Sequence, residues 1–235
     1  MKRENFFDLL IIAALLIAII FLPACKKSAA GSSPSVPLSN PLTDSLVACF
    51  KFNGDLSDST GKNIAGVSSG AVSLVTDRKG NNSSAVNFGA SAKLTLSGIK
   101  IPNPNTVTLS YWVKSAATAS LQYYIVANQT VGIAASQSGN LFFGVVSTPS
   151  TNSAYATIVD NNWHHLVTTY NGTNIKFYLD GALAATTNHP GNITNTTYDY
   201  VIGFFNSTYW QGNIDELRIY KTVLTDSQVL QLSKL

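Results

Sequence analysis

The acidic side chains are the first candidates for chemistry in this sequence, and they are few. Among 235 residues there are 12 Asp and Glu, and Glu4 and Glu216 are the only glutamates. Glycoside hydrolysis needs two carboxyl groups held about 5 to 10 Å apart, one as the acid and one as the base or nucleophile. Asp55 and Asp58 share a loop, which does not fix their separation. The sequence therefore predicts a protein that is not an enzyme, and glycoside hydrolysis is the function that it favours least.

The adjacent histidines His164 and His165 are the second candidates, as metal ligands or as a general base. Adjacent residues of a β-strand point to opposite faces, so the two imidazoles cannot belong to one site. His165 alternates with Trp163 and Val167, which predicts that it packs inside and is satisfied by a backbone group. We expect a structural role for both histidines.

A loop rich in oxygen atoms, residues 53–63, contains Asp55 and Asp58 among several Ser, Thr and Asn side chains. Calcium takes six to eight oxygen ligands from carboxylates, amides and carbonyls, and such a loop can wrap one ion. The alternative is an ordinary turn whose Asp and Asn side chains accept hydrogen bonds from its own backbone. The sequence leaves a structural Ca²⁺ and the self-capped turn as open alternatives.

Aromatic rings beside amides are typical of sugar-binding surfaces, because rings pack on apolar sugar faces and amides bond the hydroxyls. Residues 195–211 combine both features in NTTYDYVIGFFNSTYWQ. The candidates for ligand binding are Tyr198, Asn206, Tyr209 and Gln211. The alternative is that these tyrosines only cover the face of a sheet.

These side chains must be positioned by β-strands, because apolar and β-branched residues recur in short runs separated by Gly, Asn and Ser. Residues 163–170 alternate as a half-buried strand does, and Asn171-Gly172 and Asp180-Gly181 are two-residue turn signals. The predicted strands are residues 46–53, 71–75, 85–88, 93–96, 106–114, 123–128, 131–135, 141–146, 155–158, 163–170, 175–179, 183–187, 200–204 and 213–220.

Many short strands at regular spacing predict an all-β fold, a two-sheet antiparallel jelly-roll sandwich. Only the end of the chain has a helical pattern. Thr225 and Gln228 have the spacing of a capping box, and Val229 and Leu232 follow as an apolar stripe. We therefore expect a short C-terminal helix.

Two sequence blocks resemble a known family. WHHLVTTYNGTNIKFYLDGALAAT at residues 163–186 and GNIDELRIY at residues 212–220 are similar to signatures of the laminin-G-like, or concanavalin A-like lectin/glucanase, superfamily. The resemblance covers residues 45–235 and implies the jelly-roll sandwich. The Glu-x-Asp-x-x-Glu strand of the hydrolases in this superfamily is absent.

The same resemblance implies roles for two residues near the second block. Some relatives bind Ca²⁺ through the loop after the first strand and the Asp of the second block, which adds Asp215 to Asp55 and Asp58 as implied ligands. The aromatic residue before the block, here Trp210, is usually part of the core.

The N-terminal residues 1–24 are predicted to be a lipoprotein signal peptide. Lys2 and Arg3 precede an apolar run, residues 9–22, that is shorter than the about 20 residues of a membrane span. A small residue and then Cys25 follow the run, as at a lipoprotein cleavage site. The alternative is an uncleaved N-terminal anchor helix.

Cys25 is accordingly the predicted site of lipidation. Residues 26–42 are rich in Ser, Ala and Pro and read as a flexible tether, and residues 43–235 as one domain. We predict a lipid anchor in a bacterial membrane, the outer membrane, with the periplasmic face and the cell surface left as alternatives.

The charge content narrows the possible classes of partner, and the cysteine content indicates how the fold is stabilised. Residues 43–235 carry 11 Lys and Arg against 10 Asp and Glu, without a basic stripe, which argues against nucleic acid. Cys49 is the single cysteine of this domain, so the fold depends on its core and not on a disulfide. The sequence predicts a non-catalytic envelope module for carbohydrate binding or adhesion, with a protein-binding or structural module as the alternative.

Overall fold

The computed structural model describes residues 40–100, 105–115, 122–127, 132–135, 141–144, 158–188, 190, 197–205 and 207–235. Side chains are described for all of these except residues 122–127, 132–135, 141–144, 197, 198 and 205. Residues 39–235 form one compact unit. In the described part of the chain no helix has the length and apolar character that a membrane span requires. The predicted signal peptide, Cys25 and nearly all of the predicted tether lie outside the described residues.

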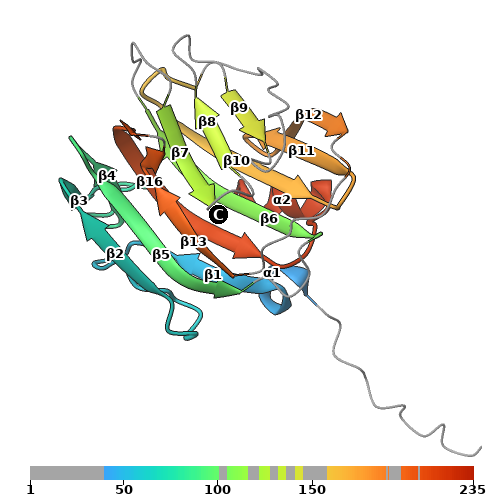
Figure 1. Ribbon diagram of the computed structural model, residues 1–235, viewed down its shortest axis with the longest axis horizontal. Helices are drawn as coiled ribbons and strands as arrows, with labels where there is room; N and C mark the ends of the chain where they lie inside the picture. The colour runs from blue at the N-terminus through green and yellow to red at the C-terminus, as the bar shows by residue number, and fades with distance from the viewer. Residues whose placement is uncertain are drawn as a thin grey trace, which may run out of the picture. The chain divides into compact units, whose positions relative to one another are not determined.

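The larger of two antiparallel sheets contains β16, the strand formed by the GNIDELRIY sequence (Figure 1). Its order is β12–β11–β10–β6–β16–β4–β3, and β1 pairs with the second half of β16. The strands are β1 (Leu46–Phe50), β3 (Val72–Val75), β4 (Ala85–Phe88), β6 (Val107–Lys114), β10 (Trp163–Tyr170), β11 (Asn174–Leu179), β12 (Ala182–Asn188) and β16 (Gly212–Tyr220).

The smaller sheet has the order β2–β5–β13–β7–β8–β9, and a two-stranded hairpin, β14–β15, follows β13. The strands are β2 (Ala65–Ser69), β5 (Lys93–Lys100), β7 (Gln122–Ala127), β8 (Gly132–Ala135), β9 (Leu141–Gly144), β13 (Thr197–Ile202), β14 (Phe204–Phe205) and β15 (Thr208–Tyr209). The predicted all-β fold of two antiparallel sheets is thereby confirmed. Strand β2 was not predicted, because its sequence AGVSS has little apolar alternation.

The core lies between the two sheets. Every second residue of β6 faces it, and these residues pack against alternate residues of β5 and β13. The central members from these three strands are Val107, Leu109, Tyr111, Val113, Leu94, Leu96, Tyr200 and Ile202, each no more than 2% exposed. Trp210 is also fully buried in this core, as predicted.

The opposite face of the larger sheet is covered by the end of the chain. Helix α2 (Asp226–Leu232) places Val229 and Leu232 on Val167 and Tyr178, which point away from the smaller sheet. The one-turn helix α1 (Pro41–Asp44) begins inside the predicted tether, and its Leu42 packs against the same cluster. Strand β10 is therefore buried on both faces from its third residue onward, and the prediction of a half-buried strand was wrong.

The two turns of the β10–β11–β12 meander differ from each other. Asp180 and Gly181 both have positive φ, of 51° and 84°, as the predicted two-residue turn requires. The β10–β11 connection has three residues, 171–173, where a two-residue turn was predicted. In this loop the Asn171 side chain accepts hydrogen bonds from the backbone amides of Thr173 and Asn174.

Candidate functional site

The residues predicted to bind sugar lie at the β14–β15 hairpin and in the strand before it. Tyr209 ends β15, with 36% of its surface exposed, and Gln211 is exposed two residues later. Tyr198 lies in β13, opposite Ile99 of β5, and the structure describes its backbone but not its side chain. Asn206 lies outside the described residues.

The hairpin presents a pair of aromatic rings at the surface. The ring of Tyr209 packs on that of Phe204, with 4.6 Å between the ring centroids and 44° between the planes. The ammonium group of Lys93 lies over the other ring, 5.4 Å from the centroid of Phe204. We call Phe204, Tyr209 and Lys93 the hairpin patch. Its rings can pack on the apolar face of a sugar, while Lys93 and Gln211 can donate to hydroxyl groups.

The residues considered for calcium do not form a cluster. In the described part of the chain no three His, Cys, Asp or Glu side chains come together as metal ligands, and Asp55, Asp58 and Asp215 are all described. The Asp58 carboxylate already accepts from the backbone amides of Cys49 and Thr60 and from the hydroxyl of Thr60. Asp55 accepts from the amide of Ser57, 2.8 Å away.

These hydrogen bonds fit the self-capped turn and do not fit a calcium site. A cation at Asp58 would displace donors that hold the loop to β1, where Phe50 and Asp58 also form a β-bridge. Asp215 is 1% exposed and pairs with the guanidinium of Arg78. Among the described residues, Asp55, Asp58 and Asp215 therefore do not converge as ligands of one Ca²⁺.

Asp215 belongs to a buried polar layer on the face of the larger sheet that points away from the smaller sheet. Arg78 pairs with Asp215, and its guanidinium carbon lies 4.7 Å from the centroid of the Trp112 ring. Burial raises the pKa of Asp215 to about 6, and the positive charge of Arg78 acts in the opposite direction. Trp112 in turn packs on His165, with 5.1 Å between the ring centroids and 38° between the planes.

His165 is buried, as predicted, but it faces away from the core that lies between the two sheets. It lies opposite Trp112 on the outward face of the larger sheet, and its Nε2 hydrogen-bonds the Ser110 hydroxyl at 2.9 Å, not a backbone group. Burial, together with the charges of Arg218 and Arg78, lowers its pKa to about 3. The imidazole is therefore neutral and serves as a packing group.

His164 points to the other face, so the two histidines do not form one site. Its Nδ1 lies 2.9 Å from Asp180 Oδ2 and its Nε2 lies 3.2 Å from Asp160 Oδ1. Asp180 Oδ1 also accepts from the backbone amide of His165 at 2.8 Å. These contacts tie the β11–β12 turn to β10, which is a structural role.

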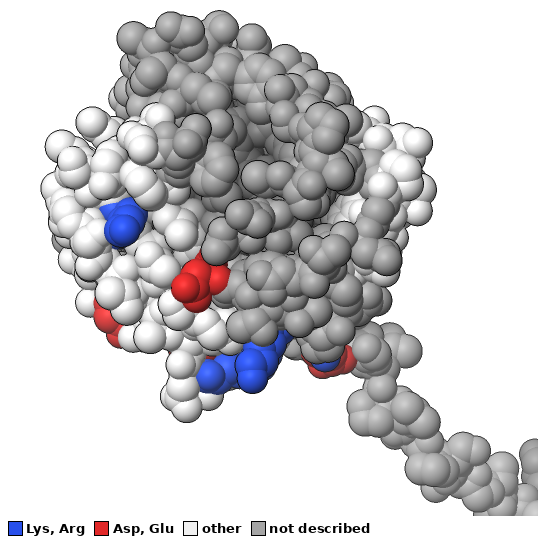
Figure 2. Space-filling view, in the orientation of Figure 1, with Lys and Arg blue, Asp and Glu red and all other residues white. Residues whose placement is uncertain are grey.

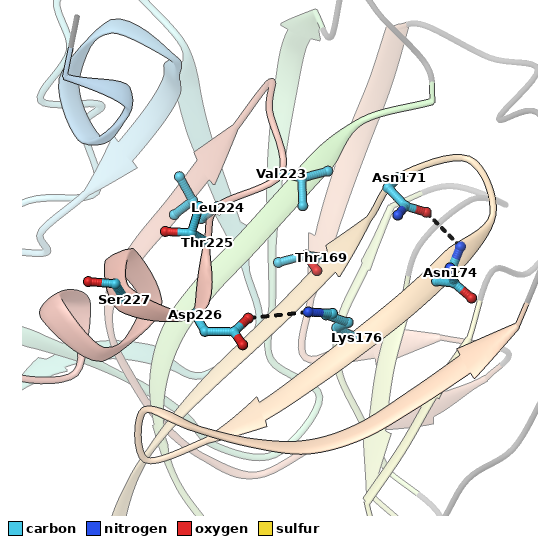
Figure 3. Close-up of a pocket in the computed structure, with 9 residues that line it drawn as sticks. All are labelled: Thr169, Asn171, Asn174, Lys176, Val223, Leu224, Thr225, Asp226 and Ser227. Carbon is cyan, nitrogen blue, oxygen red and sulfur yellow. Dashed lines mark hydrogen bonds and ion pairs between the residues drawn. The ribbon is translucent and has the colours of Figure 1, made fainter. Parts of the chain in front are cut away.

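A polar groove that the sequence did not reveal lies on the outward face of the larger sheet (Figure 3). Its volume is about 480 Å³, within the range of small-molecule sites. One wall is the β10–β11 hairpin, and the other is the segment that leads into α2 together with the first two residues of that helix. The lining residues are Thr169, Asn171, Asn174, Lys176, Val223, Leu224, Thr225, Asp226 and Ser227.

Charged side chains are sparse on the face of the molecule shown in Figure 2. Among the residues described there, the Lys and Arg atoms form separate small spots, and no spot extends into a stripe. A nucleic acid requires a continuous basic footprint. The hairpin patch, with two aromatic rings and one lysine, and the groove, which is lined mostly by neutral polar groups, are thus the better candidates for ligand contact.

A family model described as the concanavalin A-like lectin/glucanases superfamily matches residues 88–230. Domain 4 of AbnA, an extracellular arabinanase of Geobacillus stearothermophilus solved with arabinotriose, is similar in structure, with a TM-score of 0.66 and 25% identity. The match covers 80% of this chain and 98% of that one. No curated protein matches the chain in sequence at a significant level.

Binding domains of clostridial neurotoxins have the same fold. A structure of botulinum neurotoxin type C, from work on its interaction with two ganglioside molecules, has a TM-score of 0.64 and 17% identity over 82% of this chain. The botulinum neurotoxin DC binding domain in complex with rat synaptotagmin II has a TM-score of 0.66 and 16% identity over 82% of this chain. The chain spans about half the length of these toxin chains, 51% and 52%.

Proposed function

Because this chain belongs to the concanavalin A-like lectin/glucanase superfamily, we propose that it is a non-catalytic module that binds glycans at a bacterial cell envelope. The observation that carries the proposal is the hairpin patch, where Tyr209 and Phe204 form an aromatic platform beside Lys93. The exposed Gln211 follows Tyr209 by two residues. The arabinotriose complex of the AbnA domain, which the match covers almost completely, supports a sugar as the ligand.

A non-catalytic role agrees with the carboxylates of the described residues. Asp215 and Glu216 are adjacent, but each is paired with an arginine, Asp215 with Arg78 and Glu216 with Arg218 at 2.5 Å. A glycosidase instead needs one carboxyl group to give a proton and a second to act from the other side of the sugar. Because both carboxylates lie in one strand and each is occupied by a guanidinium group, they do not form such a pair on opposite sides of a sugar.

The proposal includes a lipid anchor at Cys25, which the lipoprotein-like N-terminal sequence supports. Several acyl chains would hold the domain at the membrane far more firmly than one chain does. Detergent-phase partitioning of the full chain and of a Cys25→Ser variant tests the anchor. A wild-type protein that stays in the aqueous phase contradicts it.

The glycan experiment uses the full chain in detergent on an array of bacterial, plant and animal glycans, followed by titration of the glycans that bind. We expect Tyr209→Ala to weaken binding about tenfold, because it removes the ring that packs on the sugar. Tyr209→Phe keeps the ring and should bind nearly as the wild type does.

Leu183→Ala is the matched control, because Leu183 is 46% exposed on β12 of the other sheet. It should leave the affinity unchanged. Failure to bind any glycan class would overturn the proposed function, and capture of one stoichiometric protein partner instead would favour a protein-binding module. Strand β2 suits that second function, since it forms an edge of the smaller sheet and exposes 62% of Val67.

A further inference from the structure

The groove on the larger sheet is built by two segments that meet only in the folded protein. The β10–β11 hairpin supplies Asn171, Asn174 and Lys176 (Figure 3). The segment before α2 supplies Val223, and the first residue of α2 is Asp226. None of these residues belongs to the hairpin patch. The groove is therefore a separate place where a ligand can be recognised.

At one end of the groove the Asn171 amide is held in a fixed orientation. Its Oδ1 accepts from the backbone amides of Thr173 at 3.0 Å and Asn174 at 2.6 Å. Both acceptor positions of this oxygen are thus used within the loop, and the Nδ2 group is turned toward the groove, across from Val223 (Figure 3). This end offers a hydrogen-bond donor facing an apolar side chain.

At the other end a cation and an anion stand side by side. Lys176 Nζ lies 3.2 Å from Asp226 Oδ1, and the side chains are 38% and 64% exposed. Tyr178, which is buried, donates its hydroxyl proton to the same Oδ1 at 2.7 Å and so fixes the carboxylate. An exposed ion pair of this kind contributes little stability, so both groups can also contact a ligand.

We propose that this groove is a second glycan site, which recognises two adjacent hydroxyl groups of a neutral saccharide. One hydroxyl donates to Asp226, its neighbour accepts from Lys176, and Asn171 donates to a further oxygen. Because the two charges cancel, the groove does not select for an anion or a cation, and the apolar Val223 suits a carbon face of the sugar ring. The inference rests on the proposed glycan-binding function.

The test uses the full chain with mannotriose and arabinotriose, each intact or after periodate cleavage and borohydride reduction. Periodate cuts the bond between adjacent hydroxyl-bearing carbons, so the treated sugars keep polar groups but lose the ring diol. In a Tyr209→Ala background, calorimetric titration should detect binding of at least one intact sugar and at least tenfold weaker binding of its treated form.

Two variants in the same background assign this binding to the groove. Lys176→Met removes the donor of the ion pair, and Asn171→Asp keeps the oxygen that the loop amides need while it removes Nδ2. Each should weaken binding at least tenfold with an unchanged thermal midpoint. Lys51→Met, at an exposed lysine outside the groove, should have no effect.

The possible results distinguish a failure of the groove site from a failure of the proposed function. Wild-type binding that Tyr209→Ala abolishes overturns the groove site while the hairpin patch stands. Binding in the Tyr209→Ala background that Lys176→Met and Asn171→Asp leave unchanged also overturns the groove site. Equal binding of intact and treated sugars in the Tyr209→Ala background also overturns it. Binding of no glycan by the wild type overturns both proposals.

Discussion

The apolar residues of β16 are spaced irregularly, and a single residue reconciles them with a strand. Ile214, Leu217 and Ile219 all face the core, although a regular strand would put Ile214 and Leu217 on opposite faces. The register against β6 shifts between Asp215 and Arg218, and Glu216 takes a left-handed φ of 54°. This β-bulge places both Asp215 and Arg218 on the outward face.

The bulge could have been inferred from the sequence, while its consequence could not. A three-residue step between apolar positions in an otherwise alternating strand is a signal for an extra residue. The bulge brings Asp215 to Arg78, which is far away in the chain. This contact depends on the positions of β3 and β4, because Arg78 lies in the loop between them. The same limit explains why His165 was assigned to the wrong face, since its alternation shows two faces but not which one meets the second sheet.

His165 makes the stability of the fold depend on pH. Burial lowers its pKa from 6.5 to about 3, so between these values the unfolded chain binds a proton that the folded protein does not. The contribution of the neutral imidazole to the free energy of unfolding is complete above pH 6.5. It is lost as the pH falls toward 3, by at most about 1.4 kcal/mol per pH unit.

Urea denaturation of the full chain and of His165→Gln at several values between pH 7 and pH 4 measures this contribution. The variant cannot take up the proton, so we expect its free energy of unfolding to fall less steeply with decreasing pH than that of the wild type. Parallel curves for the two proteins would show that His165 is not the group responsible.

At the scale of elements, the strands with the most buried residues were predicted best. The bounds of β4 and β10 agree with the sequence analysis to the residue, whereas the weakly apolar β2 was missed. The hairpin patch was found in part, through Tyr209, because an aromatic ring beside amides is a local signal. The groove was not found, because Lys176 and Asp226 are 50 positions apart and each belongs to a segment with its own structural explanation.

Helix α2 is held at its start by the predicted capping box. Thr225 Oγ1 accepts from the backbone amide of Gln228 at 3.3 Å, and Gln228 Oε1 accepts from the amide of Thr225 at 2.8 Å. The helix has only seven residues, too few to be stable without this cap and its packing on the sheet. The cap therefore also fixes Asp226 in the groove.

We expect Thr225→Ala to lower the free energy of unfolding by about 1 kcal/mol, because an amide at the start of the helix loses its acceptor. Urea denaturation of the full chain measures the loss. Ser227→Ala, one position after Asp226, is the control, since Ser227 is exposed and its change to Ala should alter stability by less than about 0.5 kcal/mol. Equal effects of the two substitutions would contradict a role for the cap.

For the whole molecule, covering both faces of the larger sheet has a consequence for function. The core side is closed by the smaller sheet and part of the outward side by α2, and the groove lies beside the start of this helix. The hairpin patch lies next to the smaller sheet, where β14 follows β13. A module with both sites would present separate sugar contacts on different elements, which raises avidity for a repeating glycan.

The fold should need no calcium. Asp58 is engaged by amide and hydroxyl donors and Asp215 by Arg78, so the bonds that a metal would supply to these carboxylates are already made within the protein. We therefore expect the thermal midpoint of the full chain to be the same in EDTA and in 1 mM Ca²⁺. A site with a dissociation constant of about 10 μM would instead add about 2.7 kcal/mol at this concentration and raise the midpoint by several degrees. Such a rise, lost in Asp58→Asn, would restore the calcium loop as a real site and would require that glycan titrations be repeated with the ion present.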